Sequence, residues 1–244
     1  TFLINMTKLS VNINKIATIR NARGGNTPSV TDAAKAIENF GAEGITIHPR
    51  PDERHITRED VKHLKSIVKT EFNIEGYPSD SFIKMVLNIL PEQVTLVPDG
   101  PDVITSNAGW DCLKNKDFLV PIIQKFKNAG IRVSLFVDPD PAQVEAAFAC
   151  NTDRIELYTE AYASNYKLDK DKAIQQYKLA AKKATELGLG INAGHDLNLD
   201  NLAYFIQEIP NTLEVSIGHA LISDALYYGL SNVVQMYKSK INSI

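Results

Sequence analysis

Most histidines in this chain stand where short apolar runs end, next to other polar groups. They are His48, His55, His195 and His219, four of the five in the sequence. Histidine has the ordinary side-chain pKa closest to neutrality, so histidines grouped with a carboxylate in a sheltered site suit general acid/base catalysis. Another apolar run ends at Glu75. We therefore expect His48, Glu75 and His195 to transfer protons, although a single histidine in such a position can simply cap a helix or bind a loop.

Glu156 lies inside another apolar run, between Ile155 and Leu157. In a strand, successive side chains face opposite sides, so this carboxylate points away from its two apolar neighbours. If that side is the interior of the protein, an unpaired carboxylate there is costly and becomes a functional candidate. A structural ion pair with Arg132 or Arg154 is the alternative.

Cationic groups follow the first two runs, at Arg23, Arg50 and His55. A guanidinium matches phosphate oxygens with a planar fork of donors. Arg23 also lies in a glycine-containing stretch that we expect to be an anion-binding loop. Surface pairs between these arginines and Asp52 or Glu53 are the alternative.

The segments that must position these groups alternate between two patterns. Short β-branched or apolar runs bounded by turn residues predict strands, and segments of helical periodicity lie between them. The predicted strands are 9–14, 44–48, 72–75, 93–97, 132–137, 154–157, 190–193 and 214–217. The predicted helices are 30–40, 58–69, 80–90, 118–129, 141–149, 169–187, 199–207 and 220–242, the last broken near Gly229.

Eight strands, each followed by a helix, predict an α/β protein with a (β/α)8 TIM-barrel fold in a single domain over residues 1–244. A doubly wound open sheet would use similar units. The fingerprint GxGxxG is absent after the first strand, where Asn14, Lys15 and Ile16 stand. We therefore favour the closed barrel.

In such a barrel, catalytic groups come from the carboxyl ends of the strands and the loops that follow. Phosphate is often bound on backbone amides after strands seven and eight, where glycine lets the backbone approach the ligand. The pairs Gly194-His195 and Gly218-His219 occupy these places, although glycines at strand ends are common. We expect the long loop 98–116 after strand four to be a mobile lid.

Composition narrows the class of partner. The chain has 244 residues, 44% hydrophobic and 23% charged, with a formal net charge of -3. Without a long basic run we expect no nucleic-acid partner, and no apolar run reaches the roughly 18 residues of a membrane span. Cys112 and Cys150 show no CxxC spacing, which favours a reducing compartment. We expect a cytoplasmic protein, with residues 1–5 an extension ahead of a start at Met6.

These residues belong to longer segments that resemble a known family, the pyridoxine 5′-phosphate synthases. The matching segments are VNINKIATIRNARG at 11–24, GITIHPRPDERHIT at 44–57, NIEGY at 73–77, LVP at 96–98, VSLFVDPD at 133–140, NAGH at 192–195 and IGHALI at 217–222. They run in order through nearly the whole chain. The RNARG and HPRPDERHI motifs are much more specific than any single histidine at a strand end.

The resemblance implies a barrel enzyme with extra helical segments that forms homo-octamers built from dimers and needs no metal or organic cofactor. Its two phosphorylated substrates would be 1-deoxy-D-xylulose 5-phosphate and 3-amino-2-oxopropyl phosphate. Their condensation would give pyridoxine 5′-phosphate, phosphate and water, beginning with an imine between the amine of one and the ketone of the other. Repeated proton transfers then explain why several acid/base groups are needed.

Carried over residue by residue, the resemblance divides the site into three groups. It implies that His48 and Glu75 accept protons, His195 donates one and Glu156 assists the transition state. The aminoketone phosphate would be held by Asn12, Arg23, Asp196, Gly218 and His219. The deoxyxylulose phosphate would be held by Asn14, Lys15, Arg50, His55 and Thr105.

Four positions depart from the family pattern. Asn14 and Lys15 stand where aspartate and histidine are expected, which changes the charge around the sugar phosphate. Asp196 and Glu160 stand where glycines are expected. A carboxylate at position 196 would repel a phosphate unless it turns away or pairs with a cation.

Two other functions stay open. Another phosphate-binding barrel is one, such as a sugar-phosphate epimerase or a synthase of tryptophan biosynthesis. A metal-dependent epimerase would need several histidine and aspartate ligands around one ion, which the paired Asn12 and Asn14 disfavour. A non-catalytic sensor of phosphorylated metabolites is the other, and it would bind ligands without turnover.

The oligomeric state has one further signal, a group of apolar residues near the end of the chain. Such residues form either an interface or an ordinary helix core. They are Leu221, Leu226, Tyr227, Tyr228 and Leu230.

Overall fold

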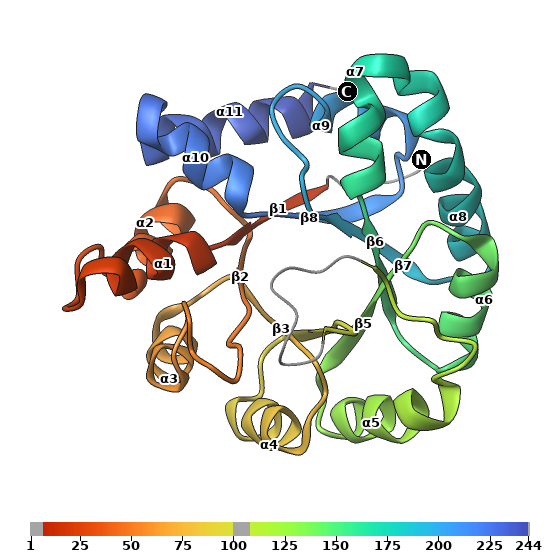
Figure 1. Cartoon of the computed structure of the whole chain (residues 1–244), viewed down its shortest axis with the longest axis horizontal. Helices are drawn as coiled ribbons and strands as arrows, with labels where there is room; N and C mark the ends of the chain where they lie inside the picture. The colour runs from red at the N-terminus through yellow and green to blue at the C-terminus, as the bar shows by residue number, and fades with distance from the viewer. Residues whose placement is uncertain (1–6, 100–107, 244) are drawn as a thin grey trace.

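A computed structural model of the chain describes residues 7–99 and 108–243. Eight parallel strands close into a barrel in chain order, with β8 pairing back to β1 (Figure 1). This topology confirms the predicted barrel and excludes the open sheet. The strands are β1 (Lys8–Asn12), β2 (Gly44–Ile47), β3 (Glu71–Gly76), β4 (Gln93–Leu96), β5 (Arg132–Val137), β6 (Arg154–Tyr158), β7 (Gly190–Gly194) and β8 (Thr212–Ile217).

Helices surround the barrel on its outside (Figure 1). They are α1 (Asn14–Arg23), α2 (Val30–Asn39), α3 (Arg58–Ile67), α4 (Asp80–Ile89), α5 (Lys116–Asn128), α6 (Pro141–Ala149), α7 (Glu160–Ala173), α8 (Gln175–Glu186), α9 (Leu202–Glu208), α10 (His219–Tyr228) and α11 (Leu230–Asn242). The predicted break at Gly229 is confirmed, because this glycine ends α10 with a φ of 80°. No described helix is both long and apolar enough to cross a bilayer.

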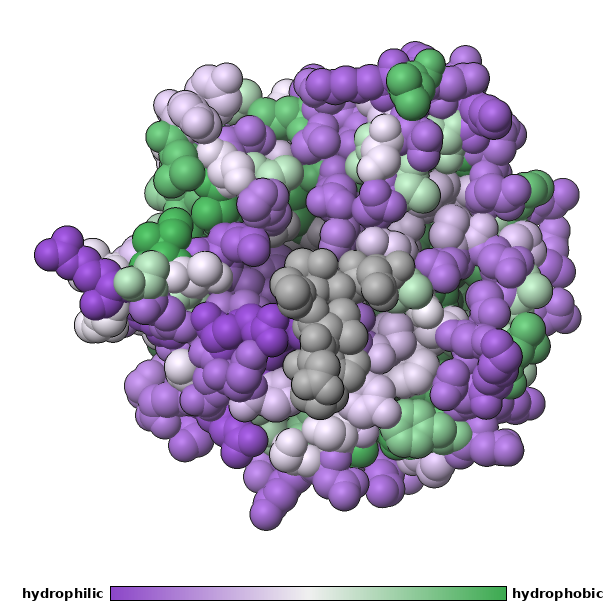
Figure 2. Space-filling model, viewed as in Figure 1, coloured by the Kyte–Doolittle hydropathy of each residue, from purple (hydrophilic) through white to green (hydrophobic). Residues whose placement is uncertain are grey.

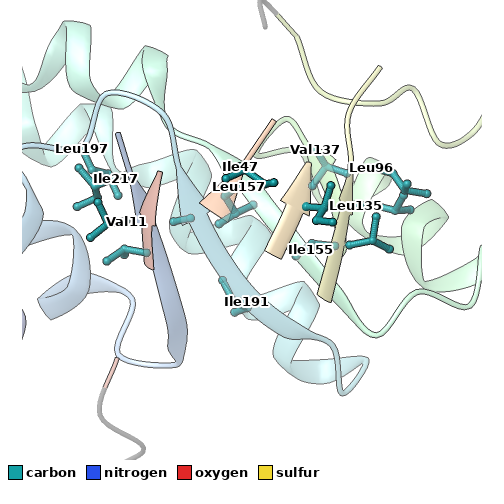
Figure 3. Close-up of a cluster of buried hydrophobic side chains, with 14 of the residues drawn as sticks. Val11, Ile47, Leu96, Leu135, Val137, Ile155, Leu157, Ile191, Leu197 and Ile217 are labelled. Carbon is teal, nitrogen blue, oxygen red and sulfur yellow. The ribbon is translucent and has the colours of Figure 1, made fainter. Parts of the chain in front are cut away.

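The outward faces of the strands build the apolar core between barrel and helices. Leu9 and Val11 of β1 are fully buried there, as are Ile45 and Ile47 of β2. Figure 3 shows aliphatic side chains of this core contributed by strands around the barrel. Each such side chain stabilises the fold by about 1.5–3 kcal/mol relative to exposure, so this layer holds the strand ends in place.

The inward faces of the strands are polar. Ser10 Oγ and Thr46 Oγ1 lie 2.7 Å apart, and Asn73 Nδ2 donates to Thr46 Oγ1 at 3.3 Å. Thr95 Oγ1 in turn donates to Asn73 Oδ1 at 3.1 Å. Branched aliphatic side chains fill most barrels of this kind, so the polar interior is a distinguishing feature of this chain.

Charged residues occupy the amino-terminal end of the barrel interior, and we call Glu71, Arg132, Arg154 and Glu214 the floor cluster. Arg132 pairs with Glu71. Arg154 Nη1 lies 3.9 Å from Glu71 Oε1 and 3.8 Å from Glu214 Oε2. Both arginines therefore neutralise carboxylates of the floor cluster.

The first strand is shorter than predicted, and helix α1 replaces the expected anion-binding loop. Asn12 Oδ1 accepts a hydrogen bond from the backbone N–H of Asn14 at 3.0 Å, which satisfies a donor at the start of the helix. Arg20 of α1 turns into the fold, where its Nη1 lies 2.6 Å from Asp60 Oδ1. This arginine thus neutralises a buried carboxylate of α3.

The predicted helix 169–187 was also wrong in extent. α7 begins at Glu160, and Asp169 within it has non-helical backbone angles, φ -161° and ψ 91°. α8 then continues from Gln175. The first half escaped prediction because Tyr162 is the one fully buried side chain of α7, so its sequence shows little helical periodicity.

Part of the predicted lid 98–116, including Thr105, lies outside the described residues. The described part that follows is packed against the barrel. Trp110 is 4% exposed, and its Nε1 donates to the carbonyl oxygen of Leu96 at 3.0 Å. Cys112, two residues later, is fully buried. Residues 108–115 are therefore anchored, and a lid motion of this loop stays a prediction.

Candidate active site

The carboxyl ends of the strands surround a cavity of about 620 Å³. Hydrophilic side chains gather around the centre of the face shown in Figure 2. Twelve of the fourteen site residues predicted from the sequence line the cavity. They are Asn12, Asn14, Lys15, His48, Arg50, His55, Glu75, Glu156, His195, Asp196, Gly218 and His219.

The other two predicted residues are not brought to this cavity. Arg23 is the exposed last residue of α1 and is not part of the cavity lining. Thr105 lies outside the described residues. A role for either in holding a phosphate stays a prediction.

Glu75, near the end of β3, is half-buried and faces this cavity. Asn12 Nδ2 donates to its Oε2 at 3.3 Å. Burial raises the pKa of Glu75 to about 8, and the carboxylates of Glu214 and Asp99 add to the increase. A carboxyl group with such a pKa exchanges its proton readily near neutral pH.

Glu156 is 3% exposed and points into the barrel, so the side opposite its apolar neighbours is the interior. Burial raises its pKa well above the ordinary value, the charge of Glu75 adds to this increase, and a hydrogen bond with Thr95 opposes it. Its Oε2 has no hydrogen-bond partner among the described residues. Such a buried, unsatisfied carboxylate is expected at a site that exchanges protons.

The structural alternative for Glu156 was an ion pair with Arg132 or Arg154. Neither pair is present in the described part of the chain, because both arginines bind Glu71 in the floor cluster. Gly194 on the neighbouring strand makes room instead. A Cβ at this position would collide with Glu156 Oε1.

Two histidine rings follow β2, with centroids 6.3 Å apart. Burial lowers the pKa of His48 to about 3, and the Arg50 guanidinium adds to the decrease. Burial, Arg50 and Lys15 lower the pKa of His55 to about 4. Both rings are therefore neutral at pH 7. The backbone N–H of Ile56 donates to His55 Nδ1 at 2.9 Å, so Nε2 carries the proton of the neutral ring.

Two asparagines at the end of β1 and the start of α1 hold proton-transfer residues in place. Asn12 bonds Glu75, as above. Asn14 Oδ1 accepts a hydrogen bond from the backbone N–H of His48 at 2.9 Å. An aspartate would accept the same bond, so the neutral amide keeps this link while removing a charge from the cavity.

Arg50 is buried in the cavity wall against a residue that the sequence did not single out. Its Nη2 lies 3.3 Å from Asp99 Oδ2, and both side chains are almost completely buried. No local pattern connects residues so far apart in the chain; the one sequence signal is that a buried cation needs a counter-charge.

His195 follows β7 in a tightly held turn. Its backbone has a φ of 80°, which is uncommon for a residue with a side chain. The Thr159 hydroxyl donates to the carbonyl oxygen of Gly194 at 2.7 Å and also to that of His195. The ring packs edge-on against Tyr158 with centroids 5.0 Å apart. Its Nδ1 lies 2.7 Å from Asp196 Oδ2.

The amino-terminus of α10 also meets the cavity, because Gly218 and His219 line it. Gly218 caps this helix without a side-chain hydrogen bond. A Cβ on Gly218 would lie 3.0 Å from Asn12 Cβ, so the glycine allows the helix end to approach β1 closely. Backbone N–H groups at a helix amino-terminus favour an anion.

Other lining residues were not predicted. Two are apolar residues in or directly after a strand, which carry no reactive group, and the other three are polar residues of helix α1, a loop and strand β8. They are Thr18, Arg54, Val97, Phe136 and Ser216. Within residues 7–99 and 108–243, no three histidine, cysteine, aspartate or glutamate side chains are grouped as a metal site would require.

Comparison with known proteins identifies the family. A family model described as pyridoxal phosphate biosynthesis protein PdxJ matches residues 9–243. The chain belongs to the PdxJ family. This confirms the resemblance drawn from the sequence motifs.

Two curated relatives of the PdxJ family, both named pyridoxine 5′-phosphate synthase, match along almost their whole length. The protein from Flavobacterium johnsoniae is 61% identical over 236 residues, covering 97% of this chain and 100% of the relative. The protein from Cytophaga hutchinsonii is 63% identical over 232 residues, covering 95% of this chain and 98% of the relative.

Solved structures support the fold of this PdxJ-family chain. KGPDC from Streptococcus mutans superposes with a TM-score of 0.66 at 12% identity, covering 98% of this chain and 99% of that one. Orotidine 5′-monophosphate decarboxylase from Methanocaldococcus jannaschii gives a TM-score of 0.64 at 11% identity, covering 97% and 99%. Similarities at this identity carry the barrel architecture alone.

Proposed function

We propose that this chain condenses 1-deoxy-D-xylulose 5-phosphate with 3-amino-2-oxopropyl phosphate to give pyridoxine 5′-phosphate, phosphate and water by acid/base catalysis. The observation that carries the proposal is the cavity at the carboxyl end of the barrel, where neutral histidines and a carboxyl group with a pKa of about 8 meet cationic side chains and a helix amino-terminus. The names of the full-length relatives support the choice of reaction.

His48 and Glu75 are proposed to accept protons, and His195 to donate one. The pKa of His48, about 3, leaves its ring unprotonated at pH 7 and ready to accept. A phosphate bound next to Arg50 offsets the guanidinium charge, which raises the pKa of His48 and makes it a stronger base. Glu156 is proposed to assist the transition state. Positive charge that develops on an imine nitrogen favours its ionised form, and the carboxylate in turn stabilises that charge.

Two sets of residues are proposed to hold the two phosphates. Asn12, Gly218 and His219 surround the amino-terminus of α10 and suit the aminoketone phosphate, with Arg23 as a further member predicted by the resemblance. The resemblance also places Asp196 in this set, but its carboxylate lies against the His195 ring. Asn14, Lys15, Arg50 and His55 lie around the end of β2 and suit the deoxyxylulose phosphate, with Thr105 as a further predicted member. Positive charge on both sides of the cavity would hold the two substrates together for imine formation.

The direct test supplies both substrates to the purified protein and follows pyridoxine 5′-phosphate by absorbance and phosphate release by a colorimetric assay. One phosphate per pyridoxine 5′-phosphate is expected. Stabilisation by each substrate with no product would support the phosphometabolite sensor and overturn the proposal. A stoichiometric, tightly held metal ion required for turnover would point to another class of barrel enzyme.

We also propose a homo-oligomer, in line with the octamer implied by the resemblance. Leu221 is buried in the helix core, but Leu226, Tyr227 and Tyr228 of α10 are 73%, 85% and 55% exposed. Figure 2 shows hydrophobic side chains gathered over the α1 and α10 side of the molecule. Exposed apolar groups of this size favour burial against another copy. Light scattering measures the assembly, and a monomer would contradict it.

A cytoplasmic location is proposed on the state of the two cysteines. Cys112 and Cys150 are both free and buried. Free thiols of this kind are typical of reducing compartments. Fractionation of the host cells would test the location, and recovery outside the cytoplasm would contradict it.

A further inference from the structure

The turn that carries His195 contains a second residue in the left-handed region, Asp196, with a φ of 64°. Aspartate tolerates this region better than most residues. The conformation folds the Asp196 side chain back onto the ring that precedes it, where Oδ2 lies 2.7 Å from His195 Nδ1. A carboxylate that the sequence placed among phosphate ligands is thus bonded to a histidine.

The surroundings hold this turn on several sides. Asn198 and Asn201 both donate side-chain hydrogen bonds to the carbonyl oxygen of Asp196, each at 3.3 Å. Tyr162 of α7 donates to the carbonyl oxygen of Asn201 at 2.7 Å. Together with the Thr159 bonds to the preceding carbonyls, these contacts fix the backbone from which both side chains project.

We propose that Asp196 is a positioning residue for His195: its carboxylate accepts the Nδ1 proton, fixes the ring orientation and leaves Nε2 as the nitrogen that transfers protons. The inference rests on the proposed function of His195 as proton donor. A carboxylate bonded to one ring nitrogen determines which nitrogen faces the reaction and stabilises the protonated ring. When the ring is protonated, its charge also offsets the repulsion that the carboxylate would exert on a phosphate.

The other groups around the pair are compatible with this role. His219 approaches from α10, and the His195 hydrogen bond is the largest cause that lowers the pKa of Asp196. Tyr158 of β6 contacts the ring edge-on. Glu160 of α7 and Asp138 after β5 act on Tyr158 electrostatically. Among the described residues, Asp196 is therefore the carboxylate that bonds the His195 ring directly.

The test compares Asp196→Asn and Asp196→Gly with the full-length wild type. Glycine suits the left-handed backbone, so Asp196→Gly removes the side chain without straining the turn. Asp200→Asn is the matched control, because Asp200 lies in the same loop, is exposed and pairs with Lys167 at 3.5 Å. Imidazole nitrogen NMR reports the ring, with the His195 signals assigned from their loss in His195→Gln.

In the wild type and in Asp200→Asn, the neutral His195 ring is expected to carry its proton on Nδ1. In Asp196→Gly the proton of the neutral ring shifts toward Nε2. Steady-state kinetics should show kcat reduced about 10- to 100-fold in both Asp196 variants, a part of the factor that general acid catalysis contributes, with KM for both substrates little changed.

Unchanged His195 signals in Asp196→Gly would overturn the proposal. So would a rise in KM for the aminoketone phosphate at unchanged kcat, which is the result expected if Asp196 acted on that phosphate directly. If the wild type forms no pyridoxine 5′-phosphate, the proposed function fails, and the NMR comparison alone decides whether Asp196 orients His195.

Discussion

The two ends of the barrel interior bury carboxylates in opposite ways. At the floor, Glu71 is bound by Arg132 and lies near Arg154. At the carboxyl-terminal end, which we call the mouth, the carboxylates of Glu75 and Glu156 have neutral partners. Glu75 accepts a hydrogen bond from Asn12, and Glu156 accepts one from Thr95. The same strands β3 and β6 thus carry a charge-compensated residue at one end and an uncompensated carboxylate at the other.

This difference separates a structural task from a chemical one. A guanidinium partner holds a carboxylate ionised, so the pair contributes to folding but does not exchange protons. With a neutral partner, burial destabilises the ionised form, so the carboxyl group keeps its proton up to near-neutral pH and can exchange it there. Glu214 lies between the two cases, because its raised pKa comes from burial and from a hydrogen bond with Glu71, while Arg154 opposes the increase.

The largest expected effect breaks the chemistry of the mouth. Glu75→Gln keeps the shape and the Asn12 contact but removes the exchangeable proton. We expect kcat to fall about 100- to 10,000-fold, the range of general acid/base catalysis, while substrate binding persists. Turnover assays and calorimetric titration measure the two quantities. Full activity in the variant would remove Glu75 from the mechanism, and Glu92→Gln on the surface serves as the control.

The next largest effect is expected when an ion pair of the floor cluster is removed. Arg154→Met leaves Glu214 and Glu71 with less compensation, and we expect the free energy of unfolding to fall by about 3–5 kcal/mol. Turnover per folded molecule should stay within a small factor of wild type. Urea denaturation gives the stability. Lys65→Met, which removes an exposed pair with Glu92, should cost under about 1 kcal/mol. Lost turnover without lost stability would mean that the floor also serves catalysis.

A third prediction concerns how the Glu75 carboxyl group makes stability depend on pH. The pKa of Glu75 rises from 4.5 to about 8 on folding, so the folded state keeps a proton that the unfolded state releases. Its contribution to stability is therefore greatest below pH 4.5 and declines as the pH rises toward 8. We expect Glu75→Gln to exceed wild type by roughly 1–3 kcal/mol at pH 9 and to lose this advantage at pH 4. Equal pH profiles would contradict the assignment.

The smallest effect concerns the layer between mouth and floor. Ser134 is fully buried, and its hydroxyl has no partner among the described residues. Ser134→Ala should leave the free energy of unfolding unchanged or raise it by up to about 1 kcal/mol. Thr46→Val removes a hydroxyl bonded to Ser10 and Asn73, and should cost about 1–3 kcal/mol. A similar cost in both variants would show that the Ser134 hydroxyl is satisfied.

Much of this comparison could be predicted from the sequence. The strands were located to within about two residues because apolar runs and glycine turns repeat along the chain. The alternation of Ile155, Glu156 and Leu157 placed the carboxylate on the face opposite its apolar neighbours, and the structure shows that this face is the barrel interior. Strand-end histidines were brought to one cavity because parallel strands share a carboxyl edge.

The contacts that distinguish mouth from floor could not be predicted in the same way. Arg20 lies close to Arg23 in the stretch where the sequence predicted an anion-binding loop, yet it neutralises Asp60 forty positions along the chain. Asp99 was overlooked, although it neutralises Arg50. Which carboxylate receives an arginine depends on strand register and on layers inside the barrel, and neither leaves a periodic signal in the sequence.

The central claim, that the mouth keeps a carboxyl group poised near neutrality, is tested most directly by a carbon NMR titration of the glutamate side chains in wild type and Glu75→Gln. The prediction is a wild-type carboxyl resonance that titrates near pH 8 and is absent from the variant. If the resonance that disappears titrates instead near the ordinary value of 4.5, burial does not hold the Glu75 proton to near-neutral pH, and the contrast between the two ends of the barrel is wrong.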